Sequence, residues 1–326
     1  MGTYVVTGCA GFIGWRVSEL LLTAGHRVIG IDNLNDAYDP RLKLWRLRQL
    51  EQHAAFTFYR YDITDRERLE PLIAASAPEA ILNLAARAGV RQSVENPWLY
   101  YETNLTGTLN LLELCRRYGI AKFVQASTSS VYGAATPPFR EQDAAAQPLS
   151  PYAASKRAAE LLCYTYHHLH GIDVTVLRYF TVYGPAGRPD MSLYIFMERL
   201  LRAEEIEIFG DGSQERDFTY VDDIAEGTLR ALRPLGYAII NLGNSQRVRL
   251  RDALALLEEA LGRRARIRYR EAHPADVRST QADISLAQAL LGWAPKVSLL
   301  EGIQRMVRWY EQYCRELPAL SLSALQ

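Results

Sequence analysis

Two side chains that together can move a proton, Tyr152 and Lys156, stand four residues apart in the segment YAASK. Residues at this spacing are neighbours on one face of a helix. A tyrosine hydroxyl titrates near pH ~10 in water, and an adjacent ammonium favours its ionised form, which acts as a general base. The pair is equally compatible with a solvated helix face, so its meaning depends on the residues around it.

A run of hydroxyl-bearing residues, Ser127, Thr128, Ser129 and Ser130, precedes this pair at the end of a predicted strand. Hydroxyls can hydrogen-bond an oxygen atom from which a base removes a proton. A Tyr-x-x-x-Lys pair alone is common by coincidence, but one that follows such a cluster is much rarer.

The glycines Gly8, Gly11 and Gly14 form the segment GCAGFIG between a predicted strand, Thr3–Thr7, and a predicted helix, residues 12–24. Glycine permits a tight turn and lets a diphosphate approach the N-terminus of the helix, where free N–H groups and the helix dipole attract anions. This spacing therefore favours a nucleotide site, with an ordinary glycine-containing turn as the alternative.

Acidic residues follow the next two predicted strands. Asp32 comes directly after Arg27–Ile31, where a carboxylate accepts hydrogen bonds from an adenosine ribose and repels a 2′-phosphate. Asp62 follows the third strand and either holds the adenine or caps a helix that starts near Thr64. The glycines and Asp32 predict NAD rather than NADP as cofactor, and a bound nicotinamide cation would further favour the Tyr152 phenolate.

Strands and helices alternate along the first half of the chain, and further strands are predicted at residues 56–61, 80–84, 122–126 and 173–177. This alternation predicts an α/β fold with a Rossmann-type, doubly wound parallel sheet. We expect an NAD-binding domain of residues 1–178 together with about 214–243. A smaller C-terminal α/β substrate-binding lobe would comprise residues 179–213 and 244–326.

The composition argues against several classes of function. Lys plus Arg and Asp plus Glu both total 37, so there is no general attraction to nucleic acid or to an anionic membrane. The basic run at residues 263–270 is expected to be a half-exposed strand. No apolar run is long enough to span a bilayer, and we expect no leader before the first strand. Because Cys9, Cys115, Cys163 and Cys314 form no CxxC pair, we expect no metal site and a cytoplasmic location.

These motifs resemble those of the extended short-chain dehydrogenase/reductase family, and the similarity runs from Thr3 to about Tyr310. Three longer stretches are similar to its UDP-glucuronate 4-epimerase branch: NLAARAGVRQSVENP (83–97), RYFTVYGPAGRPDM (178–191) and RDFTYVDDI (216–224). One departure is Asn83, where relatives usually have His. We expect it to alter a hydrogen bond at a strand end rather than the chemistry.

The resemblance implies a role for each member of a larger set of residues. Tyr152 would be the base, with Thr128 as its hydroxyl partner. The cofactor would contact Tyr152 itself and also Gly8, Gly11, Phe12, Ile13, Gly14, Asp32, Asp62, Ile63, Asn104, Lys156 and, beside the nicotinamide, Tyr179. Phe209 would lie against a uracil, and Arg216, Arg278 and Asp276 would lie near the diphosphate and ribose.

Arginine suits the diphosphate because its guanidinium is forked and stays charged at any working pH. This supports Arg216 and Arg278, although a surface ion pair is the alternative for Arg278. Arg87, Arg91 and Arg188 lie in the matched stretches, where they can bind diphosphate or a sugar carboxylate. Their alternative is structural pairing with a nearby carboxylate such as Glu95 or Asp190.

The activity implied by the resemblance is NAD-dependent epimerisation that interconverts UDP-glucuronate and UDP-galacturonate. Tyr152 would take the C4 hydroxyl proton while the C4 hydride passes to NAD, and the hydride would return to the other face of the 4-keto sugar. The enzymatic alternatives are another UDP-sugar 4-epimerase, a decarboxylase and a 4,6-dehydratase. A noncatalytic NAD-binding protein is the alternative from a different class.

Substrate choice is expected to depend on Thr181, where relatives acting on neutral UDP-hexoses usually have Asn. Thr181 is smaller, and its hydroxyl can join those of Ser129 and Ser130 in binding the C5 carboxylate. In the resembling decarboxylases and 4,6-dehydratases, the position of Ser130 is typically Glu.

The family usually forms homodimers through two helices per subunit, here residues 104–118 and 151–170. The apolar side chains of these segments can equally face their own sheet: Leu105, Leu109, Leu112, Ala158, Leu161 and Leu162.

Overall fold

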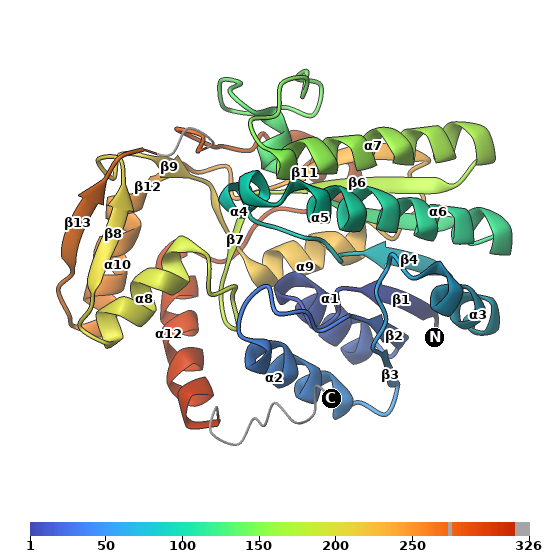
Figure 1. Cartoon of the computed structure of the whole chain (residues 1–326), viewed down its shortest axis with the longest axis horizontal. Helices are drawn as coiled ribbons and strands as arrows, with labels where there is room; N and C mark the ends of the chain where they lie inside the picture. The colour runs from blue at the N-terminus through green and yellow to red at the C-terminus, as the bar shows by residue number, and fades with distance from the viewer. Residues whose placement is uncertain (273–275, 317–326) are drawn as a thin grey trace.

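A seven-stranded parallel sheet forms the centre of the molecule in this computed structural model, which describes residues 1–272 and 276–316 (Figure 1). The strand order is β11 (Tyr237–Leu242), β6 (Asp173–Tyr179), β5 (Lys122–Thr128), β4 (Ala80–Asn83), β1 (Thr3–Thr7), β2 (Arg27–Ile31) and β3 (Phe56–Tyr59). Successive strands run outward from β1 in one direction and from β4 in the other. The predicted doubly wound sheet is confirmed, and its switch point, where such sheets bind ligands, lies between β1 and β4.

Helices cover both faces of this sheet (Figure 1). One face carries α1 (Phe12–Thr23), α2 (Pro40–Glu51) and α9 (Val221–Arg230), and the other carries α3 (Arg66–Ser76), α6 (Gly107–Tyr118) and α7 (Pro151–His170). Side chains alternate between the two faces, so Val6 packs in the first core and Val5 in the second. The short helices α4 (Val90–Glu95) and α5 (Pro97–Tyr101), the π-helix η1 (Glu102–Thr106) and the 3-10 helix η2 (Ser129–Tyr132) follow strand ends.

A smaller lobe contains three two-stranded sheets. They pair β7 (Thr181–Tyr183) with β10 (Phe218–Tyr220), β8 (Glu205–Phe209) with β13 (Arg266–Arg270), and β9 (Glu215–Arg216) with β12 (Val248–Arg249). The remaining helices are α8 (Ser192–Leu201), α10 (Leu250–Leu261), α11 (Ser285–Leu291) and α12 (Leu299–Glu316). Residues 273–275 and 317–326 of the expected lobe lie outside the described residues.

The basic run predicted as a strand does form β13, but the expectation of a half-exposed strand was wrong. All five residues of β13 are exposed, whereas Ile206 and Ile208 of its partner strand β8 are buried in the hydrophobic core. Among the described helices, none has the length and apolar character required to cross a membrane.

Candidate active site

The turn between β1 and α1 is a close-packed glycine cradle. Gly8 has a φ of +68°, and a Cβ atom there would lie 2.7 Å from the backbone nitrogen of Ala85. A Cβ on Gly14 would lie 2.0 Å from the carbonyl oxygen of Gly8. Glycine is therefore required at both positions, and in the described structure no side chain caps the N-terminus of α1 at Gly11. The free backbone N–H groups in the first turn of α1 are therefore available to an anion.

Asp32 fixes this turn against the end of β2. Its Oδ2 accepts a hydrogen bond from Ala10 N at 3.1 Å, and its Oδ1 accepts one from Leu34 N at 2.8 Å. The two carboxylate oxygens therefore accept from backbone on either side of the turn. Asp32 and the three glycines line one cavity, and this cavity has a volume of about 910 Å³. This geometry fits the predicted contact of Asp32 with a ribose.

The loop after Asp32 contributes polar groups that the sequence analysis missed. Asn33 Nδ2 donates to Asp62 Oδ2 at 2.6 Å, and Lys43 Nζ donates to Asn35 Oδ1 at 2.8 Å. Burial lowers the pKa of Lys43 to about 8. The segment DNLN directly after the second strand was the available clue, because two amides beside a ribose-binding acid are typical polar lining.

Asp62 lies in the cavity lining, as predicted, and Ile63 follows it there. Its Oδ1 accepts hydrogen bonds from Thr64 N and Thr64 Oγ1, and these bonds together with that from Asn33 lower its pKa against the effect of burial. The alternative that Asp62 caps the next helix is wrong: α3 begins at Arg66, and its N-terminal cap is Asp65, which accepts from Arg68 N.

Tyr152 and Lys156 both project from the first turns of α7 into the cavity. The helix starts here because Ser150 Oγ accepts a hydrogen bond from Ala153 N at 3.2 Å and Pro151 occupies the first position. Thr128 ends β5 in the same cavity, and its hydroxyl donates to Ser130 Oγ at 3.2 Å. The predicted base, its lysine and its hydroxyl partner are thus brought together.

Burial dominates the electrostatics of this pair. It lowers the pKa of Lys156 to about 8, an effect that the carboxylate of Glu160 opposes. It also raises the pKa of Tyr152 above its ordinary value, while Thr128 and the charge of Arg188 act in the opposite direction. Desolvation thus outweighs the protein's own charges at Tyr152, and the expectation that Tyr152 acts as a base also included a bound nicotinamide cation.

A buried ionic network that the sequence did not reveal holds α7 against the sheet. Glu160 is fully buried and accepts hydrogen bonds from Ser127 Oγ at 2.5 Å and from Arg178 Nη2 at 2.8 Å. The Arg178 guanidinium lies 4.7 Å from the centroid of the Tyr132 ring. These contacts join α7 to the ends of β5 and β6, and so position Tyr152 and Lys156.

The small lobe supplies the other end of the cavity. Thr181, Phe209 and Arg216 line it together with Asp276, as predicted, and Ser129 and Ser130 of η2 line the same cavity. Arg91 Nη2 donates to Asp276 Oδ2 at 2.6 Å, so Arg91 pairs with neither of the two acids suggested from the sequence. Arg188 Nη2 pairs with Asp190 Oδ2 at 2.5 Å, a partner suggested from the sequence, and Arg188 also lines the cavity.

Arg87 was expected to bind the substrate, but in the structure it lies near the cofactor end of the cavity. Its charge contributes to lowering the pKa of Asp62 and of Lys43. Its Nη1 is buried without a hydrogen-bond partner in residues 1–272 and 276–316, and the side chain lines the cavity. A buried guanidinium nitrogen beside the glycine cradle fits an anionic dinucleotide in this position.

Of three further predicted residues, Tyr179 lies in the cavity lining as expected, and Asn104 and Arg278 do not. Tyr179 lines the cavity, but its hydroxyl bonds Thr228 Oγ1 at 2.8 Å on α9. Asn104 lies in η1 and does not line the cavity: its side chain accepts from Arg87 N and donates to Ser155 Oγ. Arg278 is exposed and is also absent from the cavity lining.

Asn83 is buried at the end of β4 and links three strands and a helix. Its Oδ1 accepts from Thr7 Oγ1 at 2.7 Å, and its Nδ2 donates to Gln125 Oε1 at 2.9 Å and to Thr108 Oγ1 at 3.1 Å. The expectation of altered hydrogen bonding at a strand end agrees with these contacts.

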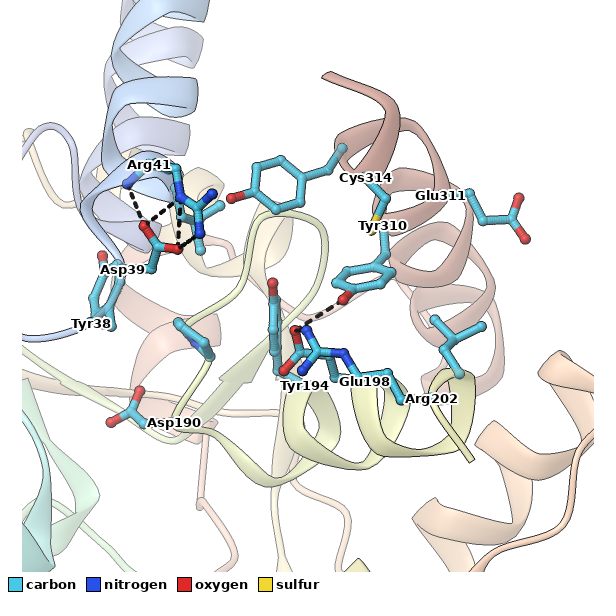
Figure 2. Close-up of a pocket in the computed structure, with 14 residues that line it drawn as sticks. Tyr38, Asp39, Arg41, Asp190, Tyr194, Glu198, Arg202, Tyr310, Glu311 and Cys314 are labelled. Atoms are coloured by element: carbon cyan, nitrogen blue, oxygen red, sulfur yellow. Dashed lines mark hydrogen bonds and ion pairs between the residues drawn. The ribbon is translucent and has the colours of Figure 1, made fainter. Parts of the chain in front are cut away.

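A second hollow of about 680 Å³ lies beside the cavity, between the start of α2 and helices α8 and α12 (Figure 2). In this hollow Arg41 pairs with Asp39, and the Tyr310 hydroxyl donates to Glu198 Oε1 at 3.0 Å. These charged groups pair with one another, and the proton-transfer pair lies elsewhere. We therefore place the candidate active site in the larger cavity.

Comparisons with known proteins agree with this arrangement. Residues 4–243 match the NAD dependent epimerase/dehydratase family. Over 313 residues, the chain is 54% identical to a UDP-glucuronate 4-epimerase of Thermodesulfobacterium geofontis, covering 96% of this chain and 97% of that protein. The crystal structure of UDP-glucuronic acid 4-epimerase from Bacillus cereus with UDP-glucuronic acid and NAD is 37% identical, with a TM-score of 0.91 over 95% of this chain and 99% of that one. A UDP-glucose 4-epimerase from Thermotoga maritima with UDP-glucose is 35% identical, with a TM-score of 0.89 over 96% of this chain and 99% of that one.

Proposed function

The chain belongs to the NAD dependent epimerase/dehydratase family, and from this membership we propose that it is an NAD-dependent UDP-glucuronate 4-epimerase. It interconverts UDP-glucuronate and UDP-galacturonate through a 4-keto sugar. The observation that carries this proposal is the convergence of Tyr152, Lys156 and Thr128 with the glycine cradle in one cavity.

The cofactor end of the cavity holds NAD. Gly8, Gly11 and Gly14 allow its diphosphate to approach α1, and Asp32 accepts hydrogen bonds from the adenosine ribose. Bound there, NAD accepts a hydride from C4 of the sugar and returns it to the opposite face. Its positive nicotinamide ring also favours the Tyr152 phenolate, which offsets the effect of burial on that side chain.

Tyr152 takes the proton of the C4 hydroxyl and gives it back after the ketone has turned over. Thr128 hydrogen-bonds the oxygen that becomes the ketone. Lys156 presents an ammonium to the cofactor ribose and to Tyr152. Glu160 supports this charge by opposing the loss of the lysine proton on burial.

The substrate end holds the UDP-sugar. Phe209 stacks on the uracil, Asp276 accepts from the ribose, and Arg216 binds the diphosphate. Ser129, Ser130 and Thr181 donate hydrogen bonds to the C5 carboxylate. Arg188 lies beside the reacting centre, since its charge affects the pKa of Tyr152.

The 4-keto form of this substrate is a β-keto acid that can lose carbon dioxide, so the product distinguishes an epimerase from a decarboxylase. Ser130 occupies the position where the resembling decarboxylases have Glu, and a serine is neither a strong acid nor a strong base near neutral pH. We therefore expect hydride return to be faster than loss of carbon dioxide.

The test is to incubate the purified protein with UDP-glucuronate to equilibrium and to analyse the products by chromatography and mass spectrometry. An isobaric product that separates from UDP-glucuronate and co-elutes with UDP-galacturonate is expected. A dominant UDP-pentose would show a decarboxylase instead, and no turnover with bound NAD would favour a noncatalytic protein.

We also propose that the protein is a homodimer that packs α6 and α7 of each subunit together. Leu112 faces the protein core, but Leu109 is 38% exposed on α6, and Leu161 and Tyr164 are more than half exposed on α7. Exposed apolar side chains on two adjacent helices are typical of a subunit interface. The variant Leu161→Glu is expected to elute as a monomer in size-exclusion chromatography, and a wild-type monomer would contradict the proposal.

All four cysteines are free thiols, with Cys9, Cys115 and Cys163 buried. This supports the cytoplasm as the proposed location, because free thiols persist in reducing compartments. We propose the division into an NAD-binding domain and a UDP-sugar lobe with the boundaries given above, except that β9 and β10, which pair with β12 and β7, are counted with the lobe.

A further inference from the structure

The side chain of Arg91 bridges the two parts of the molecule across the cavity. Its guanidinium carbon lies 3.8 Å from the centroid of the Phe209 ring, and its Nη2 donates to Asp276 Oδ2 at 2.6 Å. Arg91 belongs to α4, beside the large sheet, whereas Phe209 ends β8 in the small lobe and Asp276 follows β13. One guanidinium therefore engages an aromatic face and a carboxylate at the same time.

A polar group beside Phe209 points to a flat ligand at this place. Gln214 Nε2 donates to the Phe209 carbonyl oxygen, and Gln214 Oε1 is buried without a hydrogen-bond partner in the described part of the chain. Both residues line the cavity. A planar ring that carries an N–H group, such as the imide of uracil, can stack on Phe209 and donate to Gln214. The hydroxyls of an attached ribose can donate to Asp276.

We propose that Arg91 occupies the two contacts that the nucleoside of the substrate requires, the stacking face of Phe209 and the carboxylate of Asp276, so that nucleotide binding displaces its guanidinium from both. This inference rests on the proposed UDP-sugar function. At 3.8 Å the guanidinium and the ring are in van der Waals contact, which leaves no space for a base between them. A base can stack on this face of Phe209 only after Arg91 has moved.

Arg91 also affects the second arginine at this end. Its positive charge contributes, after burial, to lowering the pKa of Arg216, while Asp276 acts in the opposite direction. Movement of Arg91 away from Asp276 removes this like charge and leaves Arg216 as the cation beside the carboxylate. Binding of the nucleoside is thus coupled to the arginine assigned to the diphosphate.

The decisive measurement is the affinity of the NAD-loaded protein for uridine and for UDP, by calorimetric titration with UDP and competition with uridine. If Arg91 competes with the base, Arg91→Ala should bind uridine about threefold to tenfold more tightly, since a stacked cation and an ion pair are each of modest strength. Arg91→Lys keeps a cation for Asp276 without the planar stack, so its uridine affinity should be intermediate.

The matched control is Arg268→Ala, which removes a guanidinium from β13 of the same small sheet. Arg268 pairs with Glu205 at 3.8 Å and does not line the cavity, so uridine affinity should be unchanged. Circular dichroism establishes that each variant is folded. If Arg91→Ala fails to fold, Arg91→Lys decides the question, because it preserves the ion pair.

Uridine binding that is equal or weaker in Arg91→Ala and Arg91→Lys would overturn the inference, because Arg91 would then be a contact of the bound nucleotide. The proposed function would survive that result, provided that the wild-type protein binds UDP. Failure of the wild-type holoenzyme to bind UDP would overturn the inference and the proposed function together.

Discussion

The two ends of the cavity are built in different ways. At the cofactor end, the glycine cradle and Asp32 come from one continuous β1–α1–β2 unit, and the hydrogen bond from Ala10 N to Asp32 joins the two within that unit. At the substrate end, Arg91 and Asp276 are 185 positions apart in the sequence and meet only because the small lobe folds against the large sheet. The cofactor end is therefore preformed by local backbone geometry, whereas the substrate end depends on how the two parts of the molecule approach each other.

Tyr152 and Lys156 lie between these two ends. The buried Glu160–Arg178 contact fixes α7 to the sheet, so the pair does not depend on either ligand for its position. The comparison thus predicts that changes at either end affect the binding of one ligand, that loss of the Tyr152 hydroxyl affects the reaction, and that Lys156 acts on the cofactor end.

The largest effect is expected for Tyr152→Phe. The substitution removes the proton acceptor but little of the side-chain shape, so turnover of UDP-glucuronate should fall by about 10³-fold. Binding of NAD and of UDP should remain close to that of the wild type, as calorimetry can measure. Near-normal turnover would mean that Tyr152 is not the base.

A large but local effect is expected for Gly14→Ala at the cofactor end. Its Cβ would lie 2.0 Å from the Gly8 carbonyl oxygen, so the turn must shift. We expect NAD affinity to fall by about tenfold or more and stability to fall by about 1–3 kcal/mol, as for an overpacked core.

The control for Gly14→Ala is Thr23→Ala, at an exposed position of the same helix, which should leave NAD affinity unchanged. UDP binding should survive in both variants. An equal loss of UDP and NAD affinity in Gly14→Ala would break the comparison, because the two ends would then not be independent.

The same contrast explains which features could be predicted from the sequence. Alternating apolar runs predicted the parallel sheet, and the glycine spacing with Asp32 predicted the cofactor end, because both depend on residues close together in the chain. The pair Tyr152 and Lys156 was predictable for the same reason, since a helix places residues four apart together.

Long-range contacts were not predictable in this way. The sequence proposed Phe209 and Asp276 as separate ligand contacts, but the stacking of Arg91 between them required the folded lobe. Asn104 was assigned to the cofactor, whereas the π-helical turn directs its side chain to the backbone of Arg87 and to Ser155. The effect of burial on the pKa of Tyr152 was also missed, because desolvation depends on packing from all sides.

A smaller effect, confined to the substrate end, is expected for Thr181→Asn. The wild type should prefer UDP-glucuronate to UDP-glucose by at least about tenfold in kcat/KM, which corresponds to ~1.4 kcal/mol. The larger amide should crowd the carboxylate and reduce this preference to about threefold or less. NAD affinity should not change. Thr106→Asn, at an exposed position outside the cavity, is the control, and equal efficiency of the wild type on both substrates would refute the role of Thr181.

The smallest effect concerns pH at the cofactor end. Burial lowers the pKa of both Lys43 and Lys156 to about 8, far below the usual lysine value, and both side chains line the cavity. An anionic dinucleotide binds the protonated lysines better than the neutral ones, so NAD affinity is highest below pH 8 and decreases as pH rises through this value. Between pH 7 and pH 9 we expect a decrease of about threefold, measured by titration of the protein's fluorescence with NAD.

Lys43→Met and Lys156→Met should each weaken NAD binding at pH 7 and make it less dependent on pH, and the double variant should be nearly independent of pH. Lys296→Met is the control, because Lys296 is exposed and pairs with Glu226 far from the cavity lining. UDP affinity is the measurement that distinguishes the two ends. The positive charge of the substrate end comes from arginines, which stay protonated, so UDP binding should change little between pH 7 and pH 9. A fall in UDP affinity as large as that for NAD would show that the lysines act on both ligands. The cofactor end and the substrate end would then not be electrostatically independent.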